Sequence, residues 1–344
     1  MDDALSRPWP ELALSASFVS RWRSCRRASF WHTWWSWGGW KGGQNHGAES
    51  RRLAYALKGG VSTWTVAGST VHRYAARAAR LAGHGRELPD RQTTADQAVA
   101  DYRETVDKAS RRSWKRSTKR APILLDSFYG EVDPELVEIG ADRVRASVLE
   151  LLVDEHLQVL ASEARAGRRP LVHVEDPIRI DLVPEIEPQA DGVRLLTAGI
   201  SELVRLWLVP DLAYTVESPG SGGARDLVIV DWKTGRPKPE HLDQLRIYGS
   251  WAMALAWSAD RVLLVADYLQ IGEVRELRFT PAEAREAVAG LVEVVAEVLD
   301  AVEGDSLSGE LVPRMDASGS TWPQLPEDDP ACKLCDYRRL CRRG

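Results

Sequence analysis

Short apolar runs separated by turn-rich segments predict strands in much of the second half of the chain. The segment DLVIVDWKTG, from Asp226 to Gly235, contains four consecutive apolar residues and predicts a short strand buried on both faces. Upstream, ELVRLWLVPDLAYTV predicts a strand that reaches Asp211, and the turn-rich ESPGSGGARD leads into the strand of Asp231. Such a hairpin-like pair can bring both carboxylates to one edge of a sheet.

Helix and strand patterns alternate beyond this hairpin. Pro237 to Trp257 predicts a helix on which Gln244 and Tyr248, four residues apart, share one face. The segment RVLLVADYLQIGEVRELRF predicts two strands joined across Gly272, and Pro281 to Val302 predicts an amphipathic helix.

The first half of the chain has mainly helical patterns. An Ala-rich segment predicts a helix that begins near Ser69 and carries His72 in its first turns, and Thr94–Arg120 and Pro134–Gly167 predict further helices. A lone histidine is more often structural than a ligand.

We expect one domain over residues 1–344. It begins with an N-terminal Trp/Arg-rich segment at residues 15–45 and has a helical insertion at residues 83–165. The core follows at residues 170–303, and a C-terminal loop with cysteines at residues 304–344.

The distribution of charge indicates a polyanionic partner more clearly than the total does. The 344-residue chain has a net charge of −5, but residues 1–120 hold 22 Lys and Arg against 10 Asp and Glu. Such asymmetry favours a basic face, although a solvated helix surface explains any single cluster equally well. No apolar run approaches the roughly 20 residues of a membrane helix, and no secretion signal is evident, so we expect a cytoplasmic protein.

Arginines alternate with tryptophans in the segment SRWRSCRRASFWHTWWSWGGW. Aromatic rings can stack on unpaired bases while arginines hold phosphates, but the same rings can equally pack a core. The basic run RRSWKRSTKR offers a second place where phosphates could bind. The candidate DNA-binding residues are therefore Arg21, Arg23, Arg26, Arg27, Trp114, Lys115 and Arg116.

The end of the buried strand carries the chemistry. Because side chains alternate along a strand, Asp231 and Lys233 share one face, and Trp232 points to the other. A carboxylate beside an ammonium can bind a divalent cation and orient a water. Taken alone, the pair is also explained as an ordinary ion pair before a Gly turn.

The succession Asp211, Asp231-x-Lys233 and Gln244-x-x-x-Tyr248 resembles the PD-(D/E)XK nuclease superfamily, specifically its RecB-like branch. The resemblance implies an α/β restriction-endonuclease-like core, a mixed central sheet flanked by helices. It implies Mg²⁺ or Mn²⁺ held by Asp211, Asp231, the Trp232 carbonyl and His72, since Gly68 to His72 matches the G-x-x-x-H helix of that branch. Lys233 would activate the water, and Gln244 and Tyr248 would position DNA or water. Pro210, where the family often has a Gly-x-x-Asp turn, is a departure.

The chain has four cysteines, Cys25, Cys332, Cys335 and Cys341, and the last three form C-x2-C-x5-C. Disulfides are unnecessary in a large cytoplasmic chain, which leaves zinc or a [4Fe–4S] cluster as the metal site. The arrangement is similar to that of AddB-type and CRISPR-associated RecB-like nucleases, which implies the iron–sulfur cluster. Because Cys25 and Cys332 are 307 residues apart, a shared cluster would remove about 5 kcal/mol of loop-closure entropy from the unfolded state.

We therefore expect a Mg²⁺- or Mn²⁺-dependent deoxyribonuclease that acts as an exonuclease on single-stranded or end-containing DNA. We also expect a structural [4Fe–4S] cluster, and a helicase, CRISPR or repair protein as a partner. The alternative is a catalytically silent DNA-binding subunit of a repair, CRISPR or phage-defence complex. The KTG at Lys233 does not indicate a serine β-lactamase, since no serine is followed by lysine three positions later. The Gly-rich SPGSGGARD lacks the Gly-Lys-Ser/Thr of a phosphate loop, which argues against an NTPase.

Overall fold

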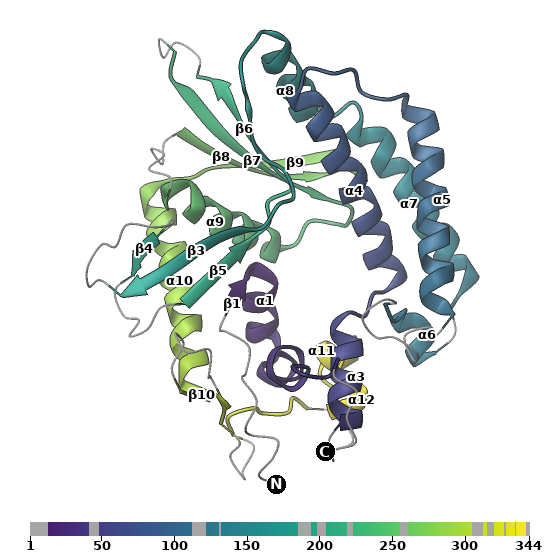
Figure 1. Ribbon diagram of the computed structural model, residues 1–344, viewed down its shortest axis with the longest axis vertical. Coiled ribbons are helices and arrows are strands. Elements are labelled where there is room, and N and C mark those ends of the chain that lie inside the picture. Colours follow the sequence, from purple (N-terminus) through teal and green to yellow (C-terminus); the bar gives the residue numbers. More distant parts are fainter. Residues whose placement is uncertain are drawn as a thin grey trace.

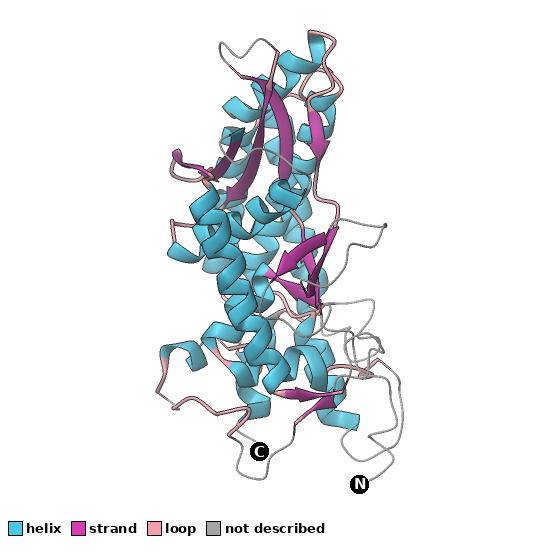
Figure 2. Ribbon diagram, turned by 90° about the vertical axis from the view of Figure 1, so that its left-hand side faces the viewer, coloured by secondary structure: helices cyan, strands magenta, loops and turns pink. Residues whose placement is uncertain are grey.

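The computed structural model of the chain shows a mixed α/β protein with a five-stranded and a four-stranded sheet flanked by helices, and a short two-stranded sheet (Figures 1 and 2). The structure describes residues 13–40, 48–111, 122–130, 132–184, 194–197, 204–218, 223–254, 261–304, 312–314, 320–326, 328–333 and 335–341. Within these ranges, no helix is long and apolar enough to cross a membrane.

The larger sheet has five strands in the order β2-β6-β7-β8-β9. Only β7 and β8 run parallel in it, and the other neighbours are antiparallel. This mixed sheet is consistent with the restriction-endonuclease-like fold that was expected. The β6–β7 hairpin and the β8–β9 pair confirm two predictions from the sequence. The strands are β2 (Leu171–His173), β6 (Leu212–Glu217), β7 (Arg225–Lys233), β8 (Val262–Tyr268) and β9 (Glu273–Arg278).

Strand β7 is the centre of this sheet and is buried on both faces, as its apolar run predicts. Leu227 and Ile229 face one core, together with side chains of α9 (Pro239–Ala254) and α10 (Pro281–Asp300). Val228, Val230 and Trp232 face a second core, which contains side chains of the helices α4 (Thr63–Gly83), α5 (Arg91–Ser110), α7 (Pro134–Leu151) and α8 (Glu155–Arg165). The alternation along one strand thus separates the two helical layers.

The smaller sheet has four strands in the order β1-β5-β3-β4 and was not foreseen as a separate unit. The segment expected to form one strand up to Asp211 instead forms two strands in different sheets, β5 and β6. Pro210 lies at the break, where it has no N–H to continue a ladder. Asp211 therefore lies in the connection directly before β6. The strands are β1 (Ala13–Ser15), β5 (Val204–Leu208), β3 (Ile178–Pro184) and β4 (Arg194–Thr197).

Two helix boundaries also differ from the prediction. The helix of His72 begins at Thr63, not near Ser69, because the side chain of Ser62 accepts a hydrogen bond from the Thr65 N–H and caps the helix. His72 consequently lies near the middle of a 21-residue helix. The stretch predicted as one helix from Pro134 is divided at Asp154, which caps a second helix. The helices are α4 (Thr63–Gly83), α5 (Arg91–Ser110), α6 (Leu125–Tyr129), α7 (Pro134–Leu151) and α8 (Glu155–Arg165).

The N-terminal and C-terminal segments lie side by side at one end of the molecule (Figure 1). The side chain of Ser15 accepts a 3.1 Å hydrogen bond from the Phe18 N–H and so caps α1. Trp22 and Trp34 are almost fully buried and pack against Trp322, so these two rings belong to the core and do not stack on bases. The elements are α1 (Ala16–Ser24), α2 (Arg26–Phe30), the π-helical turn η2 (Trp31–Trp35), α3 (Ala48–Lys58), β10 (Val302–Glu303), β11 (Val312–Pro313), α11 (Pro330–Lys333) and α12 (Arg338–Cys341).

A buried carboxyl pair joins α8 to the larger sheet. Asp267 on β8 is hydrogen-bonded to Asp154, whose carboxylate also accepts from the Leu157 N–H at 2.9 Å. Burial, the hydrogen bond to Asp154 and its negative charge raise the pKa of Asp267 to about 8. The folded protein therefore keeps a proton on this pair that the unfolded chain releases at a much lower pH.

The free energy of unfolding should fall as pH rises from about 4, the ordinary pKa of Asp, to about 8, because the folded state binds the additional proton. Asp267→Asn keeps a hydrogen-bond donor and removes the titration, so it should flatten this dependence by up to about 1.4 kcal/mol per pH unit. Urea unfolding across this pH range measures the slope. Asp107→Asn on the exposed face of α5 is the control and should leave the slope unchanged. A wild-type slope in Asp267→Asn would contradict the prediction.

Candidate active site

Asp211 joins a helix and a strand through its two carboxylate oxygens. Oδ1 lies 2.9 Å from Nδ1 of His72 on α4, and Oδ2 accepts a hydrogen bond of 2.7 Å from the Trp232 N–H on β7. The side chain of Asp211 is 6 % exposed, so these contacts are shielded from solvent. Two members of the predicted site, His72 and Asp211, are thus in direct contact although they are 139 positions apart in the sequence.

Glu175 is a third member of this group, and the sequence analysis missed it. It lies between β2 and β3, with Oε1 3.3 Å from Nδ1 of His72. One ligand atom from each of His72, Glu175 and Asp211 can be chosen so that all three lie within 4.8 Å of one another. These are one imidazole nitrogen and two carboxylate oxygens, and carboxylate oxygens are the ligands that Mg²⁺ and Mn²⁺ prefer.

An unusual backbone conformation places Glu175 there. It is the one non-glycine residue with positive φ among those described, at 52°, and its N–H donates a 3.1 Å hydrogen bond to the Pro210 carbonyl. Left-handed conformations cost free energy for residues other than glycine and concentrate at functional sites. The bond to Pro210 holds Glu175 beside the residue that precedes Asp211. No local sequence signal separates Glu175 from Asp176, whose side chain is exposed.

The end of β7 forms a chain of polar contacts. Lys233 Nζ forms an ion pair with Asp231 and donates a 2.9 Å hydrogen bond to Oε1 of Gln244 on α9. The other end of the Gln244 amide donates to the Tyr248 hydroxyl at 2.6 Å. That hydroxyl donates in turn to the Val209 carbonyl at 3.1 Å. Gln244 and Tyr248 therefore fix the ammonium of Lys233 in one position beside the Asp231 carboxylate.

Asp231 lies next to Asp211 without belonging to the three-residue group. The antiparallel register pairs Leu212 with Val230, and one further step places Asp211 opposite Asp231. In the described residues, the carboxylate of Asp231 is not within the 4.8 Å group and contacts Lys233 instead. Its role as a metal ligand, and that of the Trp232 carbonyl, stays a prediction. The Trp232 side chain is buried in the opposite core, as alternation predicts.

The pKa values reflect this concentration of negative charge. Burial and the charge of Asp211 raise the pKa of Asp231 to about 6, against the opposing effect of Lys233. Burial lowers the pKa of His72, but the charge of Asp211 and hydrogen bonds to Asp211 and Glu175 outweigh it and raise that pKa well above its usual value. Burial and the charge of Asp231 raise the pKa of Tyr248, which keeps its hydroxyl protonated. The site is therefore acidic, desolvated and suited to a positively charged occupant.

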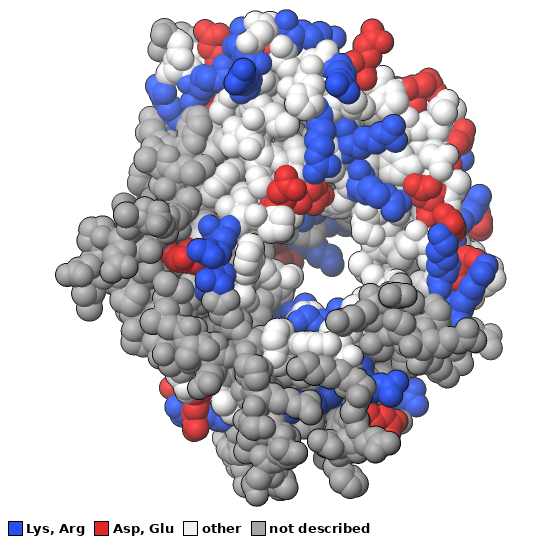
Figure 3. All heavy atoms as spheres, viewed as in Figure 1, with Lys and Arg blue, Asp and Glu red and all other residues white. Residues whose placement is uncertain are grey.

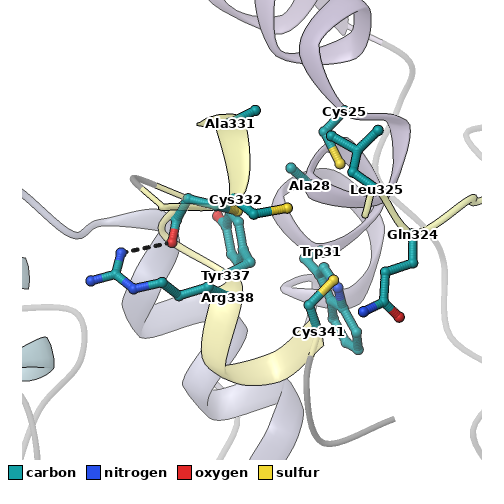
Figure 4. A pocket seen from close by; sticks show the side chains of 11 residues that line it. Cys25, Ala28, Trp31, Gln324, Leu325, Ala331, Cys332, Tyr337, Arg338 and Cys341 are labelled. Carbon is teal, nitrogen blue, oxygen red and sulfur yellow. Dashed lines mark hydrogen bonds between the residues drawn. The ribbon is translucent and has the colours of Figure 1, made fainter. Parts of the chain in front are cut away.

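The four cysteines form a second site, at the end of the molecule where the N-terminal and C-terminal segments meet (Figure 1). They come from the α1–α2 junction and the C-terminal segment, and they line one cavity of about 300 Å³. Figure 4 shows the sulfurs of Cys25, Cys332 and Cys341 directed toward a common space. None of the four forms a disulfide. Burial raises the pKa of Cys335 to about 11 and also raises that of Cys341.

The cysteine sulfurs are more widely spaced than a zinc site requires. Four thiolates at about 2.3 Å from one zinc ion lie about 3.8 Å from each other. In the part of the chain that the structure describes, no three of the four sulfurs lie within 4.8 Å of one another. The cavity between them therefore fits a group larger than a single ion.

Polar contacts outside the cysteines hold the same two segments together. The His32 ring lies 2.9 Å from the Tyr337 hydroxyl, and Tyr129 donates to the Asp336 carbonyl. The guanidinium carbon of Arg338 lies 3.4 Å from the centre of the Tyr129 ring. These contacts also connect the cysteine segment to α6.

The predicted DNA-binding arginines of the N-terminal segment make contacts within the protein. Arg26 pairs with Glu297 on α10 at 2.8 Å, and Arg23 donates to the Gly290 carbonyl at 3.4 Å. Arg21 is close to Asp336 and Tyr337, and burial lowers its pKa. A role of these residues and Arg27 in DNA binding stays a prediction. Trp114, Lys115 and Arg116 lie outside the described residues.

Comparison with known proteins places this site in a wider context. A sequence model described as the PD-(D/E)XK nuclease superfamily matches residues 48–342, which include every residue of the site around Asp211 and three of the four cysteines. No curated protein matches the chain. One similar solved structure, titled "Crystal structure of SSO0001", has 14 % sequence identity and a TM-score of 0.28 over 70 % of this chain and 84 % of that one.

Proposed function

Because the chain belongs to the PD-(D/E)XK nuclease superfamily, we propose that it is a divalent-metal-dependent deoxyribonuclease of the RecB-like branch. It hydrolyses phosphodiester bonds, and its substrates are single-stranded DNA or duplex ends, with cleavage as an exonuclease. The observation that supports this proposal best is the convergence of His72, Glu175 and Asp211 beside the Asp231–Lys233 pair.

The residues of the chain fit a hard divalent cation. Mg²⁺ or Mn²⁺ would be held by His72, Glu175 and Asp211, with Asp231 at the edge of the site and the Trp232 carbonyl as a further predicted ligand. Such a cation would neutralise the charge of the scissile phosphate and lower the pKa of a bound water.

Lys233 is placed to act on the water or on the developing charge. An ammonium has three N–H donors, and Asp231 and Gln244 occupy two of them in the described structure. The third N–H can donate to a water or to a phosphate oxygen of the substrate. Gln244 and Tyr248 act through Lys233, because they fix its position before substrate arrives. The low exposure of the Asp231 and Lys233 side chains strengthens the electrostatic interactions between them.

Asp231→Ala and Lys233→Ala should each reduce cleavage of end-labelled DNA in Mg²⁺ or Mn²⁺ by about 10²- to 10⁴-fold. DNA binding, measured without metal, should remain close to wild type. Lys108→Ala on the exposed surface of α5 is the control and should cut normally. A wild-type protein that binds DNA but fails to cut it with either metal would favour the alternative, a catalytically silent DNA-binding subunit.

Glu175→Gln should raise the Mn²⁺ concentration needed for half-maximal cleavage by about tenfold or more, since it removes one charged ligand and keeps the shape of the side chain. Asp176→Asn alters the exposed neighbour and should leave the metal dependence unchanged. A metal titration of the cleavage rate compares the two. Equal effects of both substitutions would show that Glu175 does not hold the metal.

The cysteine site supports a structural [4Fe–4S] cluster bound by Cys25, Cys332, Cys335 and Cys341. The donor set, the cavity of about 300 Å³ and the wide spacing of the sulfurs favour a cluster over a zinc ion. The group would tie the α1–α2 junction to the C-terminal segment and close nearly the entire chain into a loop. Its role is therefore to stabilise the fold.

Protein purified without oxygen should contain about four iron atoms and four acid-labile sulfides per chain and absorb visible light. Cys332→Ser should abolish the absorption and lower the melting temperature, because the closed loop contributes up to about 5 kcal/mol. Asp231→Ala should keep the wild-type absorption spectrum. One zinc ion per chain without visible absorption would contradict the cluster assignment.

A further inference from the structure

Two arginines near the end of β7 carry positive charge that no described acidic residue balances. Arg143 lies on α7, and Arg236 follows the last residue of β7 by three positions. Across the described segments of the chain, neither arginine forms an ion pair or a hydrogen bond. By contrast, Arg225 at the start of β7 pairs with Glu163 at 3.1 Å.

Arg143 is held in place by an aromatic ring. Its guanidinium carbon lies over the Trp64 ring, 4.3 Å from the ring centre, in a cation–π contact. The Nε atom is buried without a hydrogen-bond partner among the described residues. Burial and the positive charge of Arg236 lower the pKa of Arg143. Both observations indicate that the positive charge of Arg143 is unfavourable in its present surroundings, and a bound anion would stabilise it.

Helix α4 connects these arginines to the proposed metal site. Trp64, Gly68 and His72 follow one another at intervals of four residues and so lie along one side of the helix. A Cβ atom added at Gly68 would lie 3.4 Å from Oγ1 of Thr234, so α4 passes close to the end of β7. Eight residues of helix separate Trp64 from His72 by about 12 Å. The arginines are therefore within a few nucleotides of the metal site.

The surface around this region suits a nucleic-acid strand. Figure 3 shows a hollow near the centre of the face drawn, with acidic side chains above it and basic side chains around it. A cavity of about 490 Å³ that also has Trp64 in its lining contains three carboxylates, Asp126, Asp133 and Asp336, and one guanidinium, Arg338. The pair of arginines, Arg143 and Arg236, is the better match for a phosphate.

We propose that Arg143 and Arg236 form a phosphate-binding subsite that positions the DNA strand for cleavage. This inference rests on the proposed nuclease function and adds two residues to it. A guanidinium fork binds two phosphate oxygens at once, and Arg143 is already oriented by Trp64. Neither arginine touches the reacting atoms, so both act by binding the strand near the metal site.

Binding of a fluorescein-labelled 20-nucleotide oligothymidylate, measured by anisotropy in EDTA over a series of KCl concentrations, tests the subsite. Arg143→Gln and Arg236→Gln should each weaken binding about three- to tenfold and lower the slope of log Kd against log salt by about 0.7. Arg143→Lys keeps the charge and should keep the slope. Arg103→Gln is the control, because Arg103 pairs with Glu138 on an exposed surface, and it should bind like wild type.

Cleavage assays in Mg²⁺ or Mn²⁺ complete the test. Both glutamine variants should show a raised KM with kcat within about twofold of wild type, as expected for lost substrate binding. If Arg143→Gln lowers the melting temperature, the exposed Arg236→Gln decides the question. If the wild-type protein cuts DNA but both glutamine variants keep its DNA affinity and salt slope, the subsite is overturned and the nuclease proposal stands. A wild-type protein that neither binds nor cuts DNA would overturn both.

Discussion

The contact of Asp211 with His72 and with the Trp232 N–H organises the proposed active site. One carboxylate oxygen meets the helix and the other meets the central strand, so a single side chain fixes the distance between α4 and β7. Neighbouring groups depend on this arrangement: Glu175 is attached beside it through the Pro210 carbonyl, and Asp231 lies opposite it across the hairpin. Several buried carboxylates close together raise the free energy of the folded protein unless a cation neutralises them. The ligand atoms and the acidic environment therefore both indicate a divalent cation.

The two sites are connected by the structure although they lie in different regions. The cysteine segment contacts α6 through Tyr129, and Asp126 on α6 accepts a 2.7 Å hydrogen bond from the Thr63 N–H, at the first residue of α4. That helix then carries His72 to the acidic site. Loss of the proposed [4Fe–4S] cluster would therefore loosen the start of α4, the helix that supplies a proposed metal ligand. The stability of the fold and the proposed active site therefore both depend on α4.

The sequence predicted the parts of the site that depend on local pattern. Alternation along DLVIVDWK correctly placed Asp231 and Lys233 on one face with Trp232 buried on the other, and the four-residue spacing of Gln244 and Tyr248 corresponds to a direct hydrogen bond. What the sequence could not predict depends on tertiary contacts. Glu175 reaches the site through a left-handed conformation and a bond to a residue 35 positions later. Likewise, the division of one apolar segment into β5 and β6 required two sheets, which no local pattern encodes.

The most direct measurement of the central claim is the position of a bound Mn²⁺ ion. Crystals grown with Mn²⁺ and an uncleavable oligonucleotide would give an anomalous signal that locates the metal without reference to activity. We predict a peak about 2.0–2.3 Å from ligand atoms of His72, Glu175 and Asp211, with the Asp231 carboxylate turned from Lys233 toward the ion. A peak elsewhere, or none among these side chains at saturating Mn²⁺, would contradict the account.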